Sequence, residues 1–456
     1  MSKDIVADTN GNTEKLVSSE IPTFANIPRL DAQDSSFFNN FLPSINKVWR
    51  GSVLSNSLAV LVVRGTTILL RLIIVFVIAG FATPNEFGRV AYSIAIAEIA
   101  RVVADFGIDT LSIREFSILR MESERQIYAS AVAITKLILG VIIYLLFLVF
   151  FLLTRREVTI DIEAISGLLI LTGLGNNLFF NYFQACLGVT KIVFPVFVNG
   201  VVMTILVVIV FLLKPNIFLM LSLLPFSELV NFCMLSRFFR KEIRFVKEGL
   251  YFENISRLLK RGFPIAITTV CVVFYTRLDV VILSYYFDAT TVGYYGIAYR
   301  MTEPVQFIAG AFSVSIYSHI STSLVNKCHD LRELMRRYIF GTLIYGMISC
   351  LLLVVFAPII IKELFPGYIP AIPVLQVLAM ALIFRTLNNS LTAIIQAHGY
   401  FTKITIVAIW NLVLIGTILW FCVPRMGAVG AAVALLVGEI VNTILQLYIT
   451  KRIITK

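Results

Sequence analysis

The chain contains repeated apolar runs of about 20 residues, and this feature limits its possible folds more than any other. An α-helix of that length spans the ~30 Å hydrocarbon core of a bilayer. Backbone polar groups find no water there, so each run must satisfy them internally as a helix. Only 14% of the 456 residues are charged, against about 25% in soluble chains. The sequence therefore predicts an all-α polytopic membrane protein.

The runs place twelve transmembrane helices, near residues 54–80, 88–110, 128–153, 163–187, 191–213, 216–236, 263–287, 290–318, 336–361, 370–397, 402–423 and 426–449. Residues 1–50 are predicted to be a cytoplasmic tail, disordered at first because low hydrophobicity cannot offset ordering entropy, then interfacial. Residues 237–262 are predicted to be a basic cytoplasmic linker, and residues 451–456 a second cytoplasmic tail.

Lysine and arginine residues are distributed unequally between the two sides of these helices. Over loops, turns and tails, 25 lie on the side of the termini and six on the opposite side. By the positive-inside rule the basic-rich side is cytoplasmic, and so are both termini. The net charge of +11 then follows from membrane topology, and no nucleic-acid partner is predicted.

The second half of the chain repeats features of the first half. With a shift of 212, five residues recur: Gln184, Ala185, Thr190, Lys191 and Asn199 match Gln396, Ala397, Thr402, Lys403 and Asn411. With a shift of 205, Gly88 and Glu98 match Gly293 and Glu303. The chain is therefore predicted to form two six-helix lobes, residues 51–236 and 263–450, related by a pseudo-two-fold axis along the membrane normal. Such repeats are typical of transporters, although they also persist as plain scaffold.

Several arginines lie inside the predicted spans, where a central charge facing lipid would cost about 2.5–3.5 kcal/mol. Arg64, Arg71, Arg277 and Arg385 have no acidic neighbour at helical spacing. Arg277 and Asp279 are two residues apart, on opposite helix faces, so they cannot neutralise each other. We expect Arg277 to face a cavity and Asp279 a neighbouring helix, with the reverse assignment open. Arginine forks bind phosphate oxygens, so the set predicts an anion-binding cavity between the lobes, against the alternative of interhelical pairing.

Other arginines of the spans have acidic neighbours on their own helices. Arg101 lies three residues after Glu98 and four before Asp105, so span 2 can satisfy it internally. Arg300 lies three residues before Glu303. For both arginines an ion pair within the helix and a functional role remain alternatives.

Polar residues of the spans supply further candidates. Sugar hydroxyls or interhelical hydrogen bonds could use the amides of Asn177, Asn181, Gln184, Asn388, Asn389 and Gln396. Coupling to H⁺ or Na⁺ could use the acids Glu98, Asp105, Asp279 and Glu303. Lys136 lies near a cytoplasmic end and is predicted to extend to the interface. No pattern indicates catalytic residues, a metal site or another cofactor.

Two longer stretches carry a family resemblance. RGTTILLRLIIVFVIAGFATPNEFGRVAYSIA and YTRLDVVILSYYFDATTVGYYGIAYRMTEP, in this order and spacing, resemble the Wzx-type polysaccharide flippases. These proteins belong to the multidrug/oligosaccharidyl-lipid/polysaccharide exporter superfamily. The resemblance runs over residues 60–450 and does not include the first 50 residues.

The resemblance implies a function. Such flippases move undecaprenyl-diphosphate-linked oligosaccharides from the cytoplasmic to the periplasmic leaflet of the bacterial inner membrane, for O-antigen or capsule synthesis, by alternating access and without chemical conversion. The implied partners are the lipid-linked oligosaccharide, membrane lipids, and a polysaccharide polymerase, chain-length regulator and ligase. The resemblance assigns the diphosphate to the cationic lumen residues Arg64, Arg71, Arg277, Arg300 and Arg385.

Two alternatives stay open at this point. A cation-coupled multidrug exporter of the same superfamily would share the architecture, but we expect acids to dominate its cavity. A polysaccharide polymerase or ligase would be an enzyme, and the longest predicted external loop, residues 154–162, leaves little room for an active site.

Overall fold

The computed structural model describes residues 42–119, 121–154, 160–213, 216–325 and 331–454. These ranges contain helices and no strand. The helices are α2 (Leu42–Phe81), α3 (Pro84–Asp105), α4 (Ile108–Ile118), α5 (Glu122–Thr154), α6 (Ile160–Ala185), α7 (Thr190–Leu213), α8 (Ile217–Glu242), η2 (Lys247–Leu250), α9 (Phe252–Tyr286), α10 (Ala289–Val325), α11 (Leu331–Leu364), η3 (Pro366–Tyr368), α12 (Ala371–Ala397) and α13 (Phe401–Ile454). The predicted fold class, all-α and polytopic, is confirmed.

In the described ranges, nine helices are long and apolar enough to cross a membrane. α3 and α10 are also long enough but too polar to meet the same criterion. The last two predicted spans share one element, α13, which folds back at Gly427 (φ 56°, ψ −134°). Glycine adopts this positive-φ conformation without a steric penalty, so the turn needs no loop.

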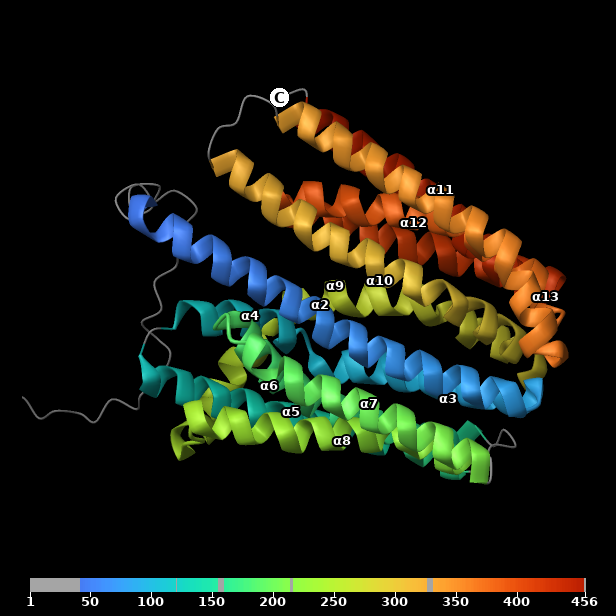
Figure 1. Ribbon diagram of the computed structural model, residues 1–456, viewed down its shortest axis with the longest axis horizontal. Coiled ribbons are helices and arrows are strands. Elements are labelled where there is room, and N and C mark those ends of the chain that lie inside the picture. The colour runs from blue at the N-terminus through green and yellow to red at the C-terminus, as the bar shows by residue number, and fades with distance from the viewer. Residues whose placement is uncertain (1–41, 120, 155–159, 214–215, 326–330, 455–456) are drawn as a thin grey trace, which may run out of the picture.

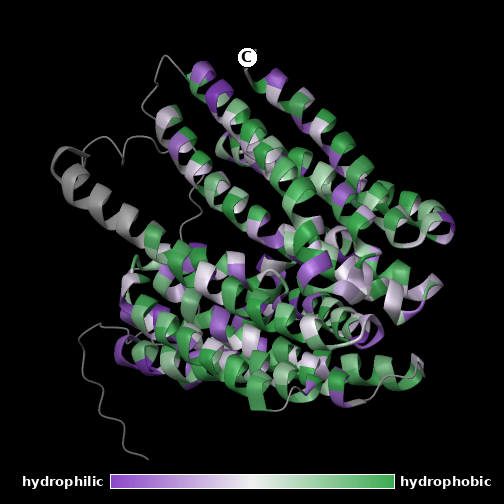
Figure 2. Cartoon of the chain, turned by 45° about the vertical axis from the view of Figure 1, so that its right-hand side comes forward, coloured by the Kyte–Doolittle hydropathy of each residue, from purple (hydrophilic) through white to green (hydrophobic). Residues whose placement is uncertain are grey.

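The helices form two groups, which we call the N-half (α2–α8) and the C-half (α9–α13). They approach each other at the right-hand end of Figure 1, the converging end, and diverge towards the left; the rotated view in Figure 2 shows the same divergence. Between the halves, α3 packs along α10 and α9. These helices place polar residues at the centre of the molecule, where Figure 2 shows hydrophilic segments between apolar ones.

Two glycines bring α3 and α10 together at the converging end. A Cβ on Gly88 would lie 1.7 Å from the carbonyl oxygen of Ala289, and a Cβ on Gly293 would lie 2.1 Å from that of Pro84. Gly88 and Gly293 are also a matched pair of the sequence repeat, with its shift of 205. Equivalent positions of the two halves therefore meet at this point.

Both helices begin with a cap at equivalent positions. The Thr83 hydroxyl accepts the N–H of Glu86, whose carboxylate accepts the N–H of Thr83, so α3 begins with a capping box. At the start of α10, the Asp288 carboxylate accepts the N–H of Thr291. The caps fix the entry of each helix next to the glycine contact.

The predicted span 88–110 is interrupted, which corrects the sequence-based prediction. α3 ends at Asp105, Phe106 and Gly107 take left-handed conformations (φ 53° and 74°), and α4 begins at Ile108. Gly107 is needed here because a Cβ would lie 2.8 Å from backbone atoms of α9. The break therefore follows directly after Asp105 and places α4 against α9.

Two predicted boundaries also differ from the structure. α8 continues to Glu242 and α9 begins at Phe252, so helices occupy both ends of the segment 237–262. Residues 42–50 of the predicted tail are continuous with α2. The prediction of disorder concerned residues that lie outside the described ranges.

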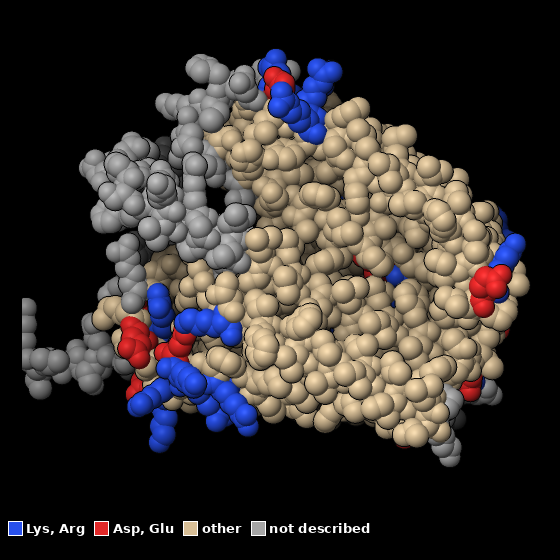
Figure 3. Space-filling model, viewed as in Figure 1, with Lys and Arg blue, Asp and Glu red and all other residues tan. Residues whose placement is uncertain are grey.

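Charged residues are concentrated at the two ends of the molecule. Figure 3 shows lysines, arginines and acids at the left, top and right, with a broad band between them whose surface is uncharged apart from a few charged atoms in a central hollow. An uncharged band between charged ends is typical of a protein that spans a bilayer.

Candidate functional site

Five charged side chains meet where the N-half contacts the C-half. Arg71 comes from α2, Glu98 from α3, Arg277 from α9, and Arg300 and Glu303 from α10. We call these residues the central cluster. Its three arginines and two glutamates carry a net formal charge of +1.

The charges alternate along the central cluster. Glu98 accepts a hydrogen bond from Arg71 at 2.9 Å and lies 2.6 Å from Arg277. Glu303 lies 2.5 Å from Arg300 and 3.8 Å from Arg277. Because Arg277 and Glu98 belong to different halves, their ion pair links the halves directly.

Arg277 and Asp279 point in different directions, as their spacing predicts. Arg277 faces Glu98 across the contact between the halves. Asp279 is buried within the C-half, where its carboxylate accepts hydrogen bonds from the Tyr295 hydroxyl of α10 and from the N–H of Val280. The acid therefore holds α9 on α10 and leaves the arginine to the interface.

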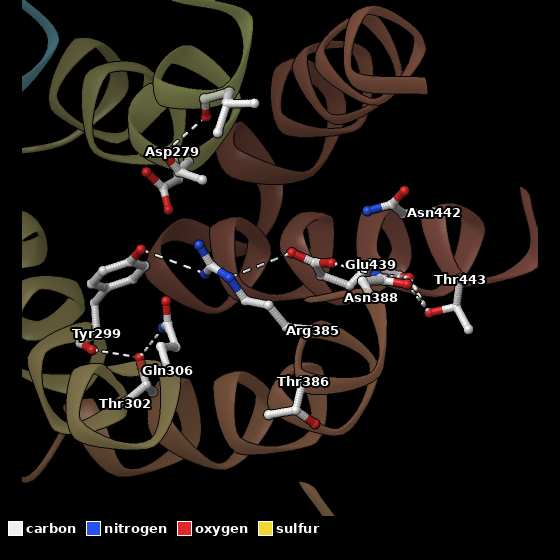
Figure 4. Close-up of polar contacts among 12 residues, drawn as sticks. Asp279, Tyr299, Thr302, Gln306, Arg385, Thr386, Asn388, Glu439, Asn442 and Thr443 are labelled. Atoms are coloured by element: carbon white, nitrogen blue, oxygen red, sulfur yellow. Dashed lines mark hydrogen bonds and ion pairs between the residues drawn. The ribbon is translucent and has the colours of Figure 1, made fainter. Parts of the chain in front are cut away.

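Arg385 lies near the central cluster and shares the aromatic neighbour Tyr299 with Arg277. Its guanidinium is 3.5 Å from the Tyr299 hydroxyl and 3.7 Å from a carboxylate oxygen of Glu439 (Figure 4). The Tyr299 ring also lies 4.8 Å from the guanidinium carbon of Arg277, within cation–π range. Arg385 is thus held less tightly by its acid than the arginines of the central cluster.

Arg64 is the most exposed of the predicted arginines. It donates to the side chain of Gln184 at 3.3 Å and lies 5.3 Å from the Phe180 ring. By contrast, Arg71, Arg277 and Arg385 face carboxylates from other helices. The predicted cationic surface is therefore largely neutralised in this conformation, a correction that helical spacing alone could not supply.

Two cavities flank the central cluster, one in each half. The first, with a volume of about 20 Å³, lies between α2, α7 and α8 and is lined by Arg71, Glu228 and Asn199 among others. The amide oxygen of Asn199 has no hydrogen-bond partner among the described residues, and this side chain is 2% exposed. The second lies beside Arg385, is lined by Tyr299, and is too small to hold a water molecule in this conformation.

The predicted sugar-binding amides are mostly engaged within their own half. Asn177 and Asn181 donate to the carboxylate of Asp109, at 2.6 and 2.7 Å. Asn388 donates to the carboxylate of Glu439 at 2.7 Å. The side chain of Gln184 accepts from Arg64, and Asn389 and Gln396 are half-buried on α12.

Lys136 does not extend to the membrane interface, which corrects the sequence-based prediction. Its side chain is 3% exposed and pairs with Asp105 at 3.0 Å and with Asp109. Asp109 in turn accepts from Asn177 and Asn181. These five residues, the Lys136 cluster, lie at the break between α3 and α4, which brings two carboxylates to one ammonium group.

For Arg101, one alternative was an ion pair within its own helix. Asp105, one of the two acids available for it, pairs with Lys136 of α5. The Arg101 side chain instead lies against Gly173 of α6, where a Cβ would be 2.9 Å away. For Arg300, the structure shows the ion pair with Glu303, which was one of the two alternatives.

The structure thus joins Glu98 and Glu303 of the predicted coupling acids and keeps Asp105 and Asp279 apart from them. Sequence analysis missed Tyr299 and Asp109. Asp109 had a usable signal, since it follows Asp105 by four residues and two like charges at that spacing require a cation. Tyr299 had no such signal, because an aromatic residue in an apolar span does not show that arginines of other helices contact it.

Similarity to solved structures shows the class of the fold. A structure described as the lipid II flippase MurJ, inward closed, matches with a TM-score of 0.67, 16% identity and 87% coverage of both chains. An inward-facing multidrug resistance MATE family transporter of the MOP superfamily matches with a TM-score of 0.65 and 14% identity, over 87% of this chain and 98% of that one. The chain is a polytopic membrane protein with the fold of these transporters.

The family model described as polysaccharide biosynthesis protein matches residues 53–322. The chain belongs to this family, which confirms the resemblance to the polysaccharide flippases. A protein of Escherichia coli (strain K12), provisionally named as an O-antigen transporter, is 29% identical over 208 residues. That match covers 44% of this chain and 49% of the relative, so the chain spans about half the length of the relative it matches.

Proposed function

We propose that the chain is a flippase that moves a diphosphate-linked oligosaccharide, carried on undecaprenol, from the cytoplasmic to the periplasmic leaflet of the bacterial inner membrane. The family and the name of the Escherichia coli relative support a role in making O-antigen or a related surface polysaccharide. The central cluster is the observation that carries the proposal, because it places three arginines at the contact between the two halves. No bond of the cargo is made or broken.

In this proposal the glutamates of the central cluster hold the place of the diphosphate. Without cargo, Glu98 and Glu303 neutralise arginines that would otherwise be costly inside a membrane. A diphosphate presents oxygens that suit the planar fork of arginine, so it replaces Glu98 at Arg71 and Arg277. The two arginines therefore keep a negatively charged partner, which is the diphosphate in place of the carboxylate of Glu98.

The same exchange would change access to the site. The pair of Arg277 and Glu98 joins the two halves, so its replacement by cargo loosens the contact between α9 and α3. In the conformation described, the halves meet at the converging end and diverge towards the end where basic residues are abundant (Figures 1 and 3). We assign that diverging end, and both termini, to the cytoplasm by the positive-inside rule, which makes this the inward-facing state of an alternating-access cycle.

The rest of the cargo would use surfaces next to the central cluster. The residues that line the small pockets beside Arg71 and Arg385 are positioned to contact the first sugars once the halves separate. Of the amides predicted to bind sugars, Asn177, Asn181 and Asn388 already donate to carboxylates. The remaining candidates are Gln184, Asn389 and Gln396, which are half-buried. The polyprenyl tail stays in the bilayer, and the flipped product passes to a polymerase, chain-length regulator and ligase.

Ion coupling is a second part of the proposal. H⁺ or Na⁺ would act most directly at Glu98 or Glu303, because these carboxylates touch the arginines that receive the cargo. Transport into proteoliposomes under an imposed proton or sodium gradient tests this part. A rate that ignores both gradients contradicts it and leaves the diphosphate site untouched.

The flippase proposal is tested in proteoliposomes that contain a fluorescent undecaprenyl-diphosphate-linked sugar. We expect the intact chain to expose inner-leaflet probe to an external quencher, and Arg277→Gln to slow this at least tenfold at equal protein content. The exposed Arg337→Gln, which removes only a surface pair with Glu333, is the matched control. Failure to flip this probe, combined with uptake of a cationic dye, would instead favour the multidrug exporter.

A further inference from the structure

One face of α8 changes from apolar to basic along its length. Leu219, Phe226 and Leu229 are 47–49% exposed, and the same face continues through exposed Arg237 and Arg240. The spacing of three, seven or eight residues keeps all of them on one side of the helix. The other faces of α8 pack on α6, α7 and α2. In a membrane protein, an exposed apolar helix face contacts lipid chains, so its basic end lies at the lipid head groups.

Further cations extend this basic end beyond the helix. Lys241, Arg244 and Lys247 are exposed, and Phe245 between them is 47% exposed. The nearby acid Glu242 is already engaged by Lys191 and by the Tyr182 hydroxyl. Figure 3 shows basic residues gathered at the left-hand end of the molecule, where α8 ends in Figure 1.

The segment that follows α8 is held firmly against α5. The N–H of Val246 donates to the Ser130 hydroxyl at 2.9 Å, and a Cβ on Gly249 would lie 2.3 Å from the Cβ of Ser130. Asn254 donates to the carbonyl of Glu248 at 2.8 Å. The cations are therefore presented on a fixed backbone, which lowers the entropy lost when a ligand binds.

The last turns of α8 and α13 each hold two cations. They are Arg240 and Lys241 in α8, and Lys451 and Arg452 in α13, where the guanidinium of Arg452 lies 4.5 Å from the Tyr448 ring. The end of α8 differs in the segment that follows it, which is held against α5 and adds exposed Arg244 and Lys247. The last turn of α13 therefore serves as a comparison that has the same charge without this segment.

We propose that Arg237, Arg240, Lys241, Arg244 and Lys247 form a binding site for the head group of an anionic phospholipid. The arginine forks take the phosphate oxygens, and the acyl chains lie along the Phe226 and Leu229 face of α8. Phe245 rests at the boundary between head groups and chains, where aromatic side chains are enriched. The site is separate from the central cluster and does not depend on the proposed cargo.

The test uses the full chain in detergent micelles, with phosphatidylglycerol or phosphatidylcholine as the added lipid. Native mass spectrometry counts retained lipid, and thermal unfolding reports stabilisation. We expect phosphatidylglycerol to bind the intact chain at least tenfold more tightly than phosphatidylcholine, and the triple variant Arg240→Gln, Lys241→Gln, Arg244→Gln to lose that preference. The double variant Lys451→Gln, Arg452→Gln is the matched control in the C-half and should keep the preference.

A further variant distinguishes a loss of lipid binding from a folding defect. Arg240→Lys with Arg244→Lys keeps the charge and should retain most of the phosphatidylglycerol binding, and unfolding without added lipid should match that of the intact chain. Equal retention of the two lipids by the intact chain would overturn the proposal. Unchanged binding in the folded triple variant, or equal loss in the C-half control, would overturn it too.

Discussion

Each half holds a glutamate through an asparagine, but the charges around the two glutamates differ. The glutamates are Glu228 of α8 in the N-half and Glu439 of α13 in the C-half. Asn176 donates to the backbone carbonyl of Glu228 at 2.7 Å, and Asn388 donates to that of Glu439 at 3.1 Å. In the N-half, the arginine beside the glutamate is Arg71 of α2, at 3.6 Å. In the C-half, it is Arg385 of α12, at 3.7 Å.

The surroundings differ further from the glutamates. The N-half carries the ionic Lys136 cluster, whereas the C-half carries a chain of neutral groups in which Thr443 donates to Asn388 and Thr392 to Gln446. The comparison teaches that the two halves share the hydrogen bond from an asparagine to the backbone carbonyl of the glutamate, whereas the arginine next to the glutamate comes from a different helix in each half.

The largest difference is expected from removing the ammonium of the Lys136 cluster. Lys136→Met removes a buried ammonium and leaves two partly buried carboxylates without their cation, which should lower the free energy of unfolding by about 3 kcal/mol. Thermal unfolding and the yield of monodisperse protein measure this. Lys191→Met is the control, because Lys191 is 56% exposed and its pair with Glu242 should contribute no more than about 1 kcal/mol. Similar losses in both variants would show that burial does not distinguish the pairs.

The next effect concerns the contact between the halves. Gly88→Ala and Gly293→Ala each place a methyl group within about 2 Å of a backbone oxygen, so either should prevent the converging end from closing. We expect cross-linking of cysteines introduced at Pro84 and Ala289 to fall several-fold in both variants. Gly310→Ala is the control, since a Cβ there meets no atom within 4 Å. A loss in only one of the two variants would break the equivalence of the halves.

A smaller difference in the free energy of unfolding is expected between variants of the two asparagines, Asn388 and Asn176. Asn388→Ala removes hydrogen bonds to the carbonyl and carboxylate of Glu439 and leaves the Thr443 hydroxyl without this acceptor, for an expected loss of about 1–3 kcal/mol. Asn176→Ala removes one hydrogen bond and should cost about 0.5–1.5 kcal/mol. Chemical unfolding in mixed micelles measures both. Equal losses would mean that the neutral network of the C-half adds nothing to the shared hydrogen bond.

The smallest effect concerns the helix caps and depends on pH. Thr83→Ala and Asp288→Ala should each cost about 1 kcal/mol, because each removes the cap of its helix. Partial burial raises the pKa of the Asp288 carboxyl, but hydrogen bonds from Thr291 and Thr290 outweigh it and hold the pKa below its ordinary value.

The two caps should therefore respond differently to acid. The contribution of Asp288 is present above the unfolded-state pKa, near 3.9, and is lost as the pH falls through the lower folded-state value. The hydroxyl of Thr83 does not titrate in this range. In acid, unfolding of the Asp288→Asn variant and of the intact chain should converge, and a constant difference between them would contradict the assignment.

Local patterns in the sequence were enough for part of this account. The apolar runs predicted the helices, and the spacing of three between Arg300 and Glu303 predicted their ion pair, because neighbours on one helix need no tertiary information. The spacing of two also predicted that Arg277 and Asp279 diverge. The matched positions Gly88 and Gly293 were visible as a repeat before their contact was known.

The remaining features depend on how helices rotate and pack. The partners of Arg71 and Arg277 come from other helices, and no periodicity within one span reveals them. Lys136 was misplaced because its carboxylates belong to α3 and α4, whereas Lys136 belongs to α5. The break at Phe106 and Gly107 was missed because the run around it is apolar enough to continue as one helix. A glycine in a span is a weak sign of a break, since most glycines here lie within helices.

The central claim is that a diphosphate takes the place of Glu98 between Arg71 and Arg277. The most direct measurement is the affinity of undecaprenyl diphosphate for the purified chain, its Arg277→Gln variant and its Glu98→Gln variant, all checked for equal thermal unfolding. We predict at least tenfold weaker binding for Arg277→Gln and equal or tighter binding for Glu98→Gln, because the latter removes the competing carboxylate and keeps both arginines. Unchanged affinity in Arg277→Gln, or a loss in Glu98→Gln as large as the one predicted for Arg277→Gln, would contradict the account.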